Sequence, residues 1–150
     1  GCTGFLPYNA GRARIFLGDS GSYGIGAAAG GLCVLAWALG AQPEAAAAPL
    51  AIYVADTGAV VLRRLRAGEP IHHAHRTHVY QRLTDLGWSH QKVALFVSTL
   101  TLACGLLGWV GTFGLALRVM TDIVIIALAA LYLMSPRLIA HAAQERRESR

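Results

Sequence analysis

Four long apolar stretches constrain the fold of this chain more than any other feature of its sequence. Residues 22–41, 45–62, 93–111 and 112–134 are predominantly apolar, and the first and third of them carry no charge. A helix needs about 20 apolar residues to cross a hydrocarbon core of about 30 Å. Only 14% of the residues are charged, against about 25% in soluble domains. We therefore predict an all-α, multi-pass transmembrane helix bundle with four spans, and exclude a soluble or disordered chain.

The polar residues between these spans are strongly sorted by charge. Residues 1–21, 63–92 and 135–150 hold 12 of the 13 Lys and Arg residues, and the two connections on the opposite side hold none. Cytoplasmic loops of membrane proteins carry an excess of Lys and Arg. We predict that these three segments are cytoplasmic, with both ends of the chain on that side of a bacterial cytoplasmic membrane.

Small residues and cysteines inside the spans predict close packing. Gly26 and Gly30 have the GxxxG spacing that lets helices approach each other. A tight turn between the last two spans is indicated by Gly108, Gly111 and Gly114. The three cysteines are expected to act as small apolar side chains: Cys2, Cys33 and Cys104.

Three ionisable residues fall within the spans. Arg118 and Asp122 are four residues apart, so they share a helix face and can neutralise each other. Asp56 has no partner in its own span, and two interpretations stay open for it. It is either a functional acid within the membrane, or it makes a hydrogen bond that packs two helices just below the interface.

The first polar segment places an acid beside flexible backbone. Asp19 lies between Gly18 and Gly21 where the first span begins. Mg²⁺ is commonly held by one or two carboxylates together with substrate phosphates, and a helix N-terminus favours phosphate. The segment is compatible with a Mg²⁺–diphosphate site, although Asp19 or Ser20 acting as a simple helix cap is the competing interpretation.

The central polar segment combines arginines with five histidines in residues 72–90. Val79, Leu83 and Leu86 predict a short amphipathic helix over residues 77–86, which Gly87 ends. The spacing fits no standard zinc site, and attraction to anionic lipid explains arginines better than neutral histidines. We favour binding of an anionic head group or nucleotide phosphate by three residues of this segment: His75, Arg76 and His78.

Two sets of motifs in this order are similar to a known family. The first comprises Gly4-Phe5-Leu6-Pro7, Asn9 and Arg14-Ile15-Phe16-Leu17-Gly18-Asp19-Ser20-Gly21-Ser22. The second comprises Asp56-Thr57, Arg63-Arg64, Ala74-His75-Arg76-Thr77-His78-Val79-Tyr80-Gln81-Arg82-Leu83 and Leu86-Gly87 with Ser89-His90. Over roughly residues 4–92, the chain resembles the polyprenyl-phosphate N-acetylhexosamine-1-phosphate transferases, of the glycosyltransferase family 4 type.

The resemblance implies a membrane enzyme that transfers a sugar 1-phosphate from a UDP-sugar to undecaprenyl phosphate and releases UMP. This reaction is the first membrane step in the synthesis of O-antigen and other cell-envelope polysaccharides. The implied partners are the UDP-sugar, undecaprenyl phosphate and membrane lipid, with no nucleic acid, and a homodimer is left open. The implied cofactor is Mg²⁺, with Mn²⁺ as the alternative ion.

The resemblance also implies roles for individual residues. Asp19 corresponds to a Mg²⁺-associated aspartate and, with His78, is expected to be catalytic. The substrate-binding candidates are Asn9, His75, Arg76 and Arg82. The paired-aspartate motif of the family belongs to its N-terminal half, so we expect these 150 residues to be a C-terminal fragment that is inactive alone. The alternative function is that of a non-enzymatic membrane protein, such as a transporter or assembly subunit.

Overall fold

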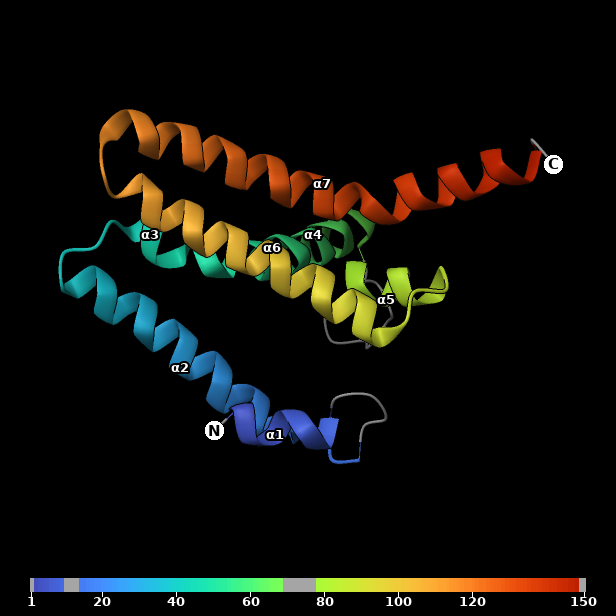
Figure 1. Ribbon diagram of the computed structural model, residues 1–150, viewed down its shortest axis with the longest axis horizontal. Helices are drawn as coiled ribbons and strands as arrows, with labels where there is room; N and C mark the ends of the chain where they lie inside the picture. The colour runs from blue at the N-terminus through green and yellow to red at the C-terminus, as the bar shows by residue number, and fades with distance from the viewer. Residues whose placement is uncertain (1, 10–13, 69–77, 149–150) are drawn as a thin grey trace.

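The computed structural model describes residues 2–9, 14–68 and 78–148, and these fold as helices joined by short connections (Figure 1). The elements in chain order are α1 (Cys2–Asn9), α2 (Gly18–Ala38), α3 (Pro43–Ala47), the 3₁₀ turn η1 (Ala48–Leu50), α4 (Ala51–Ala67), α5 (Val79–Asp85), α6 (His90–Gly111) and α7 (Leu115–Glu148).

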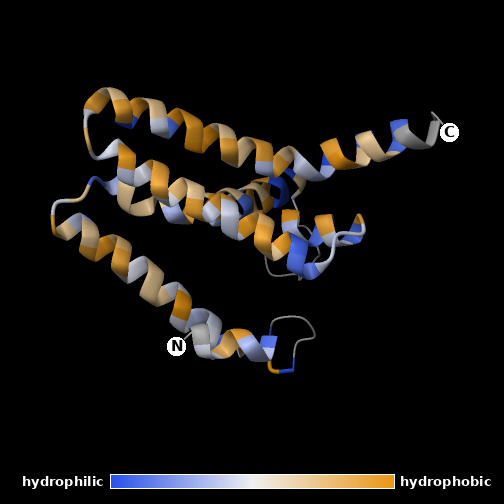
Figure 2. Ribbon diagram, in the orientation of Figure 1, coloured by the Kyte–Doolittle hydropathy of each residue, from blue (hydrophilic) through white to orange (hydrophobic). Residues whose placement is uncertain are grey.

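Four helical segments are long and apolar enough to cross a membrane, which confirms the predicted multi-pass bundle. They are Gly18–Ala38, Pro43–Ala67, His90–Gly111 and Leu115–Glu145, and Figure 2 shows that hydrophobic residues predominate along them. The second span consists of α3, η1 and α4. It is interrupted by the 3₁₀ turn, where Pro49 cannot donate a backbone hydrogen bond. The first span begins four residues earlier than predicted, at Gly18, whose φ of +68° suits glycine.

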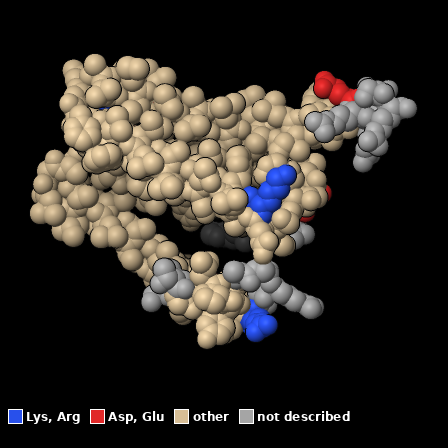
Figure 3. Space-filling model, in the orientation of Figure 1, with Lys and Arg blue, Asp and Glu red and all other residues tan. Residues whose placement is uncertain are grey.

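The connections between the helices lie at two opposite ends of the bundle. One end holds the start of α2, the end of α4, α5, the start of α6 and the end of α7, and we call it the α5 end (Figure 1). The α2–α3 and α6–α7 connections lie at the opposite end. Figure 3 shows a broad face almost free of charged residues, with charges gathered toward the α5 end. The described parts of the three segments predicted to share a side of the membrane thus lie at one end of the bundle.

The apolar core lies among η1 and the helices from α4 to α7. Its buried residues are Ala48, Ile52, Val79, Leu83, Val93, Cys104, Ile125 and Tyr132. Cys104 is fully buried, as predicted, and the half-buried Cys33 donates its thiol hydrogen to the Ala46 carbonyl at 3.1 Å. The side chain of Cys2 is outside the described residues.

The last helix continues beyond residue 134, where the predicted span ends. Helix α7 runs through Pro136 to Glu148, so residues 135–148 form helix. Pro136 lacks the N–H that would reach the Tyr132 carbonyl. The Ser135 hydroxyl donates to that carbonyl at 2.7 Å. This bond satisfies the group that proline leaves free, so the helix can continue.

The glycines pack differently from the prediction. Gly108 and Gly111 lie inside α6, and the turn itself comprises residues 112–114. A Cβ atom at Gly108 would lie 2.5 Å from the Ala48 Cβ, and one at Gly111 would lie 2.7 Å from the Thr121 Oγ1. These two glycines therefore allow α6 to approach both neighbouring spans closely.

Helix α2 lies apart from the bundle of the later helices, which corrects the packing expected for its glycines. It packs mainly against α3, and none of its described side chains is buried. A Cβ atom at Gly26 or Gly30 would meet no described atom within 4 Å. Figure 1 shows α2 diverging from α6 toward its Gly18 end.

Candidate functional site

Helix α5 lies across the end of the bundle and is anchored by two apolar side chains. Val79 and Leu83 are almost fully buried, at 2% and 0% exposure. The helix begins after His78, whose backbone N–H donates to the Gln81 Oε1 at 3.3 Å. It ends at Asp85, two residues before Gly87, whose φ is +90°. The predicted amphipathic helix is confirmed, but Leu86 is 41% exposed and follows the helix.

The carboxylate of Asp56 connects α4 to α5 and α7. Its Oδ1 accepts the Val79 backbone N–H at 3.1 Å, and its Oδ2 accepts the Tyr132 hydroxyl at 3.2 Å. Asp56 is only 5% exposed. A buried carboxylate needs such donors to offset its lost hydration. These contacts favour the packing interpretation left open above, and they place Asp56 beside a predicted catalytic residue.

That residue is His78, which caps the start of α5. Its Nδ1 lies 3.5 Å from the Asp56 Oδ2, and its ring stacks on Tyr80 with centroids 5.6 Å apart. The His78 side chain is 31% exposed, whereas that of Asp56 is 7% exposed. One edge of the imidazole therefore faces the bundle while the remainder is accessible at the α5 end.

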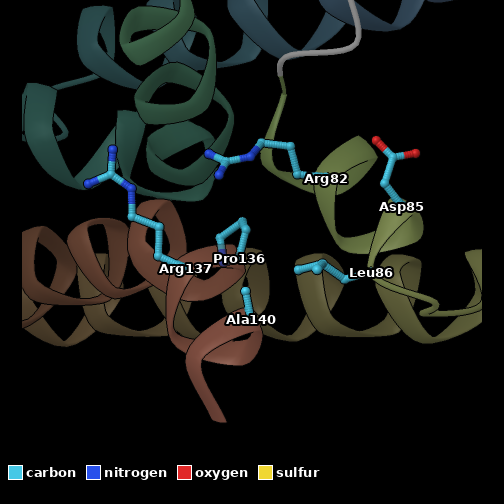
Figure 4. A pocket seen from close by; sticks show the side chains of 6 residues that line it. All are labelled: Arg82, Asp85, Leu86, Pro136, Arg137 and Ala140. Atoms are coloured by element: carbon cyan, nitrogen blue, oxygen red, sulfur yellow. The ribbon is translucent and has the colours of Figure 1, made fainter. Parts of the chain in front are cut away.

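The structure brings Arg82 close to His78. The two residues are one helical turn apart, and the Arg82 backbone N–H donates to the His78 carbonyl at 3.1 Å. Arg82 also lines an open pocket of about 310 Å³ between α5 and α7. The other lining residues are Asp85, Leu86, Pro136, Arg137 and Ala140 (Figure 4).

Arg82 and Arg137 come from different helices and extend along the same side of this pocket (Figure 4). Guanidinium groups are suited to phosphate because they present several N–H donors in one plane. The pocket therefore combines two anion-binding groups with apolar walls at Leu86 and Pro136. Asp85, on its rim, would repel an anion that moved toward it.

The two candidates in the first motif lie on other elements. Asp19 is exposed in the first turn of α2, and Asn9 is the last residue of α1. The Arg14 backbone N–H donates to the Tyr8 carbonyl at 3.0 Å, which folds the segment leading to α2 back onto α1. Figure 1 shows the start of α2 at the α5 end but separated from α5. His75 and Arg76 lie outside the described residues.

The predicted metal ligand, Asp19, is a single exposed carboxylate. Within residues 2–9, 14–68 and 78–148, no three His, Cys, Asp or Glu side chains are grouped to hold a metal. A Mg²⁺ ion keeps several waters and needs only one or two protein carboxylates when substrate phosphates complete its shell. Asp19 fits one such ligand and not a complete protein site.

Sequence reasoning missed two residues of this region and mispaired a third. Tyr132 and Arg137 had no motif to mark them. Arg118 forms its ion pair with Glu44 of α3, in place of the predicted Asp122. This pair lies at the opposite end of the bundle, where the first turn of α7 approaches α3.

Comparison with known proteins gives consistent matches. The profile of glycosyl transferase family 4 matches residues 1–37. The decaprenyl-phosphate N-acetylglucosaminephosphotransferase of Mycolicibacterium smegmatis is 34% identical over 137 residues, which cover 81% of this chain and 32% of that protein. Its counterpart in Mycobacterium tuberculosis (strain ATCC 25618 / H37Rv) is 37% identical over 112 residues, covering 64% and 27%.

A relative named for a different transferred group is also similar to this chain. The phospho-N-acetylmuramoyl-pentapeptide-transferase of Moorella thermoacetica is 33% identical over 117 residues, which cover 72% of this chain and 33% of that protein. No solved structure matches significantly. The chain spans about a third of the length of these curated relatives. On these matches and the two motif regions, the chain belongs to the family of polyprenyl-phosphate sugar-1-phosphate transferases.

Proposed function

We propose that the complete protein transfers an N-acetylhexosamine 1-phosphate from a UDP-sugar to a polyprenyl phosphate and releases UMP. The observation that carries this proposal is the position of the motif residues. Asp19, His78 and Arg82 lie at the same end of a four-span bundle, on segments like those of sugar-phosphate transferases. A lipid acceptor in the membrane and a soluble donor would meet at this end.

The reaction would join an oxygen of the lipid phosphate to the β-phosphorus of the UDP-sugar. The bond from that phosphorus to the oxygen shared with the α-phosphate would break, and UMP would leave with that oxygen. Arg82 and Arg137 can bind phosphate oxygens between α5 and α7, and His78 can contact a phosphate from the exposed side of its ring. Asp19 would provide one carboxylate oxygen to Mg²⁺, which when bound offsets the diphosphate charge.

Several finer points belong to the same proposal. Relatives named for N-acetylglucosamine make UDP-N-acetylglucosamine the first donor to test. We propose undecaprenyl phosphate as the acceptor, with decaprenyl phosphate as the comparison that those names suggest. The product would begin a cell-envelope polysaccharide, of which O-antigen is one class. The excess of Lys and Arg supports a cytoplasmic position for the α5 end.

The role of Asp19 can be tested with the complete protein in detergent, supplied with UDP-N-acetylglucosamine, Mg²⁺ and polyprenyl phosphate. We expect Asp19→Asn to lower UMP release at least about 100-fold, because loss of one charged ligand weakens a transition-state contact worth several kcal/mol. Asp122→Asn makes the same chemical change at the opposite end of the bundle and should keep UMP release within about twofold. Release by Asp19→Asn at the wild-type rate would refute the metal role.

A further inference from the structure

The buried Asp56 carboxylate faces three groups that lie outside its own helix. Its two oxygens accept from donors on two other helices, the Val79 backbone N–H and the Tyr132 hydroxyl. Burial of a carboxylate is costly, and a well-packed apolar residue at such a position is often at least as stable. The third group facing Asp56 is His78, so the carboxylate also lies beside a predicted catalytic residue at the α5 end.

The contact between Asp56 and His78 selects one form of the imidazole. A carboxylate offers only acceptor atoms. The His78 Nδ1 lies 3.5 Å from the Asp56 Oδ2, so this carboxylate favours a hydrogen on Nδ1 over a lone pair there. The Nε2 atom is then left as the acceptor. The stacked Tyr80 ring, at a centroid distance of 5.6 Å, limits rotation of the imidazole.

The surrounding contacts keep Asp56 itself in place. Tyr132 is 2% exposed and packs against Phe96, with ring centroids 6.2 Å apart. Its hydroxyl approaches the same oxygen, Oδ2, that faces His78. The opposite oxygen is held by the first N–H of α5, so a rotation of the carboxylate would break both bonds. The buried contacts therefore hold Asp56 in place, and Asp56 in turn orients His78.

We propose that Asp56 is a positioning residue that holds His78 in its Nδ1–H form, so that Nε2 is the nitrogen presented to the substrates. This inference rests on the proposed transfer reaction, in which His78 contacts a phosphate or the sugar. Asp56 touches no substrate in this account. It acts through His78, in the way that a second carboxylate orients a histidine at many sites.

The tautomer of His78 can be measured without any assay of activity. In ¹⁵N-histidine-labelled complete protein, the nitrogen shifts of the imidazole distinguish Nδ1–H from Nε2–H, and His78→Gln identifies the signal. We expect Nδ1–H in the wild type and a loss of that preference in Asp56→Asn, whose amide can also donate. Nε2–H in the wild-type protein would overturn the proposal, even if the variant failed to fold.

Kinetics provide the second readout. We expect Asp56→Asn to lower kcat about 10- to 100-fold, as substitutions of orienting partners commonly do, while KM for the UDP-sugar changes by about twofold or less. Asp56→Glu keeps a carboxylate and should recover part of the lost kcat. The control Asp122→Asn, a second acid within a span, should leave kcat and the tautomer unchanged.

The outcomes separate this inference from the function on which it rests. If the wild-type protein forms no lipid product, the proposed reaction fails, while the wild-type tautomer still decides the Asp56–His78 contact. If the wild type is active and Asp56→Asn has the same kcat, the positioning role is overturned. An equal loss of kcat in Asp122→Asn would also overturn it, because the effect would then follow from removing any acid within the spans.

Discussion

At the scale of single residues, the absence of a side chain is as informative as the charged groups. Gly108 of α6 lies where a Cβ atom would be 2.5 Å from the Ala48 Cβ and 3.0 Å from the Ala45 carbonyl oxygen. The second contact is with backbone, which cannot move aside as a flexible side chain can. Gly105, one turn earlier, has room for a Cβ at 3.4 Å from the Pro49 Cγ.

We expect Gly108→Ala to destabilise the complete protein by about 1–3 kcal/mol, because the added methyl group overpacks a closed helix contact. Gly105→Ala is the matched control, and its effect should be within about 0.5 kcal/mol or slightly stabilising. Both can be compared by reversible unfolding in mixed detergent micelles. Equal midpoints for the two variants would contradict the close approach of α6 to η1.

The interaction partners of Arg118 and Asp56 could not be predicted from residue spacing. Spacing along one helix gave Arg118 an intrahelical partner, Asp122, but the observed partner, Glu44, is distant in sequence. The partners of Asp56 are 23 and 76 residues away. Such contacts depend on how helices pack against each other, and no periodic pattern in one segment contains that information.

At the scale of elements, hydrophobic length predicted the four spans well. Their ends were less predictable, because a helix boundary depends on a few local hydrogen bonds. A proline usually indicates the end of a helix, yet α7 continues because the Ser135 hydroxyl donates to the Tyr132 carbonyl. The same proline is almost fully buried and lines the pocket beside Arg137. The continuation of α7 thus helps to form that pocket.

The compensation at Pro136 predicts a coupled pair of substitutions. Ser135→Ala alone should cost about 1 kcal/mol, the net value of a typical hydrogen bond. In Pro136→Ala, the new backbone N–H can reach the Tyr132 carbonyl, so Ser135→Ala in that background should cost less than about half as much. A double-mutant cycle of unfolding free energies measures this coupling. Additive effects of the two substitutions would show that the serine does not replace the missing bond.

At the scale of the whole molecule, the two motif regions lie at one end but on separate parts of the structure. The bundle from α3 to α7 holds His78, Arg82 and Arg137, whereas Asp19 and Asn9 lie on α2 and α1. The amphipathic pattern and the charge sorting predicted that these regions share an end. They did not predict that α2 would diverge from the bundle, because an apolar helix surface can face either lipid or protein.

In the proposed reaction, a phosphate is transferred together with the sugar. The most direct measurement uses UDP-N-acetylglucosamine labelled with ³²P at the β-phosphate, together with the complete protein, Mg²⁺ and polyprenyl phosphate. We expect the label to enter the lipid fraction as a polyprenyl diphosphate sugar, with UMP formed in equal amount. Label that stays in UDP while a polyprenyl monophosphate sugar forms would contradict the proposed reaction, as would the absence of any labelled lipid.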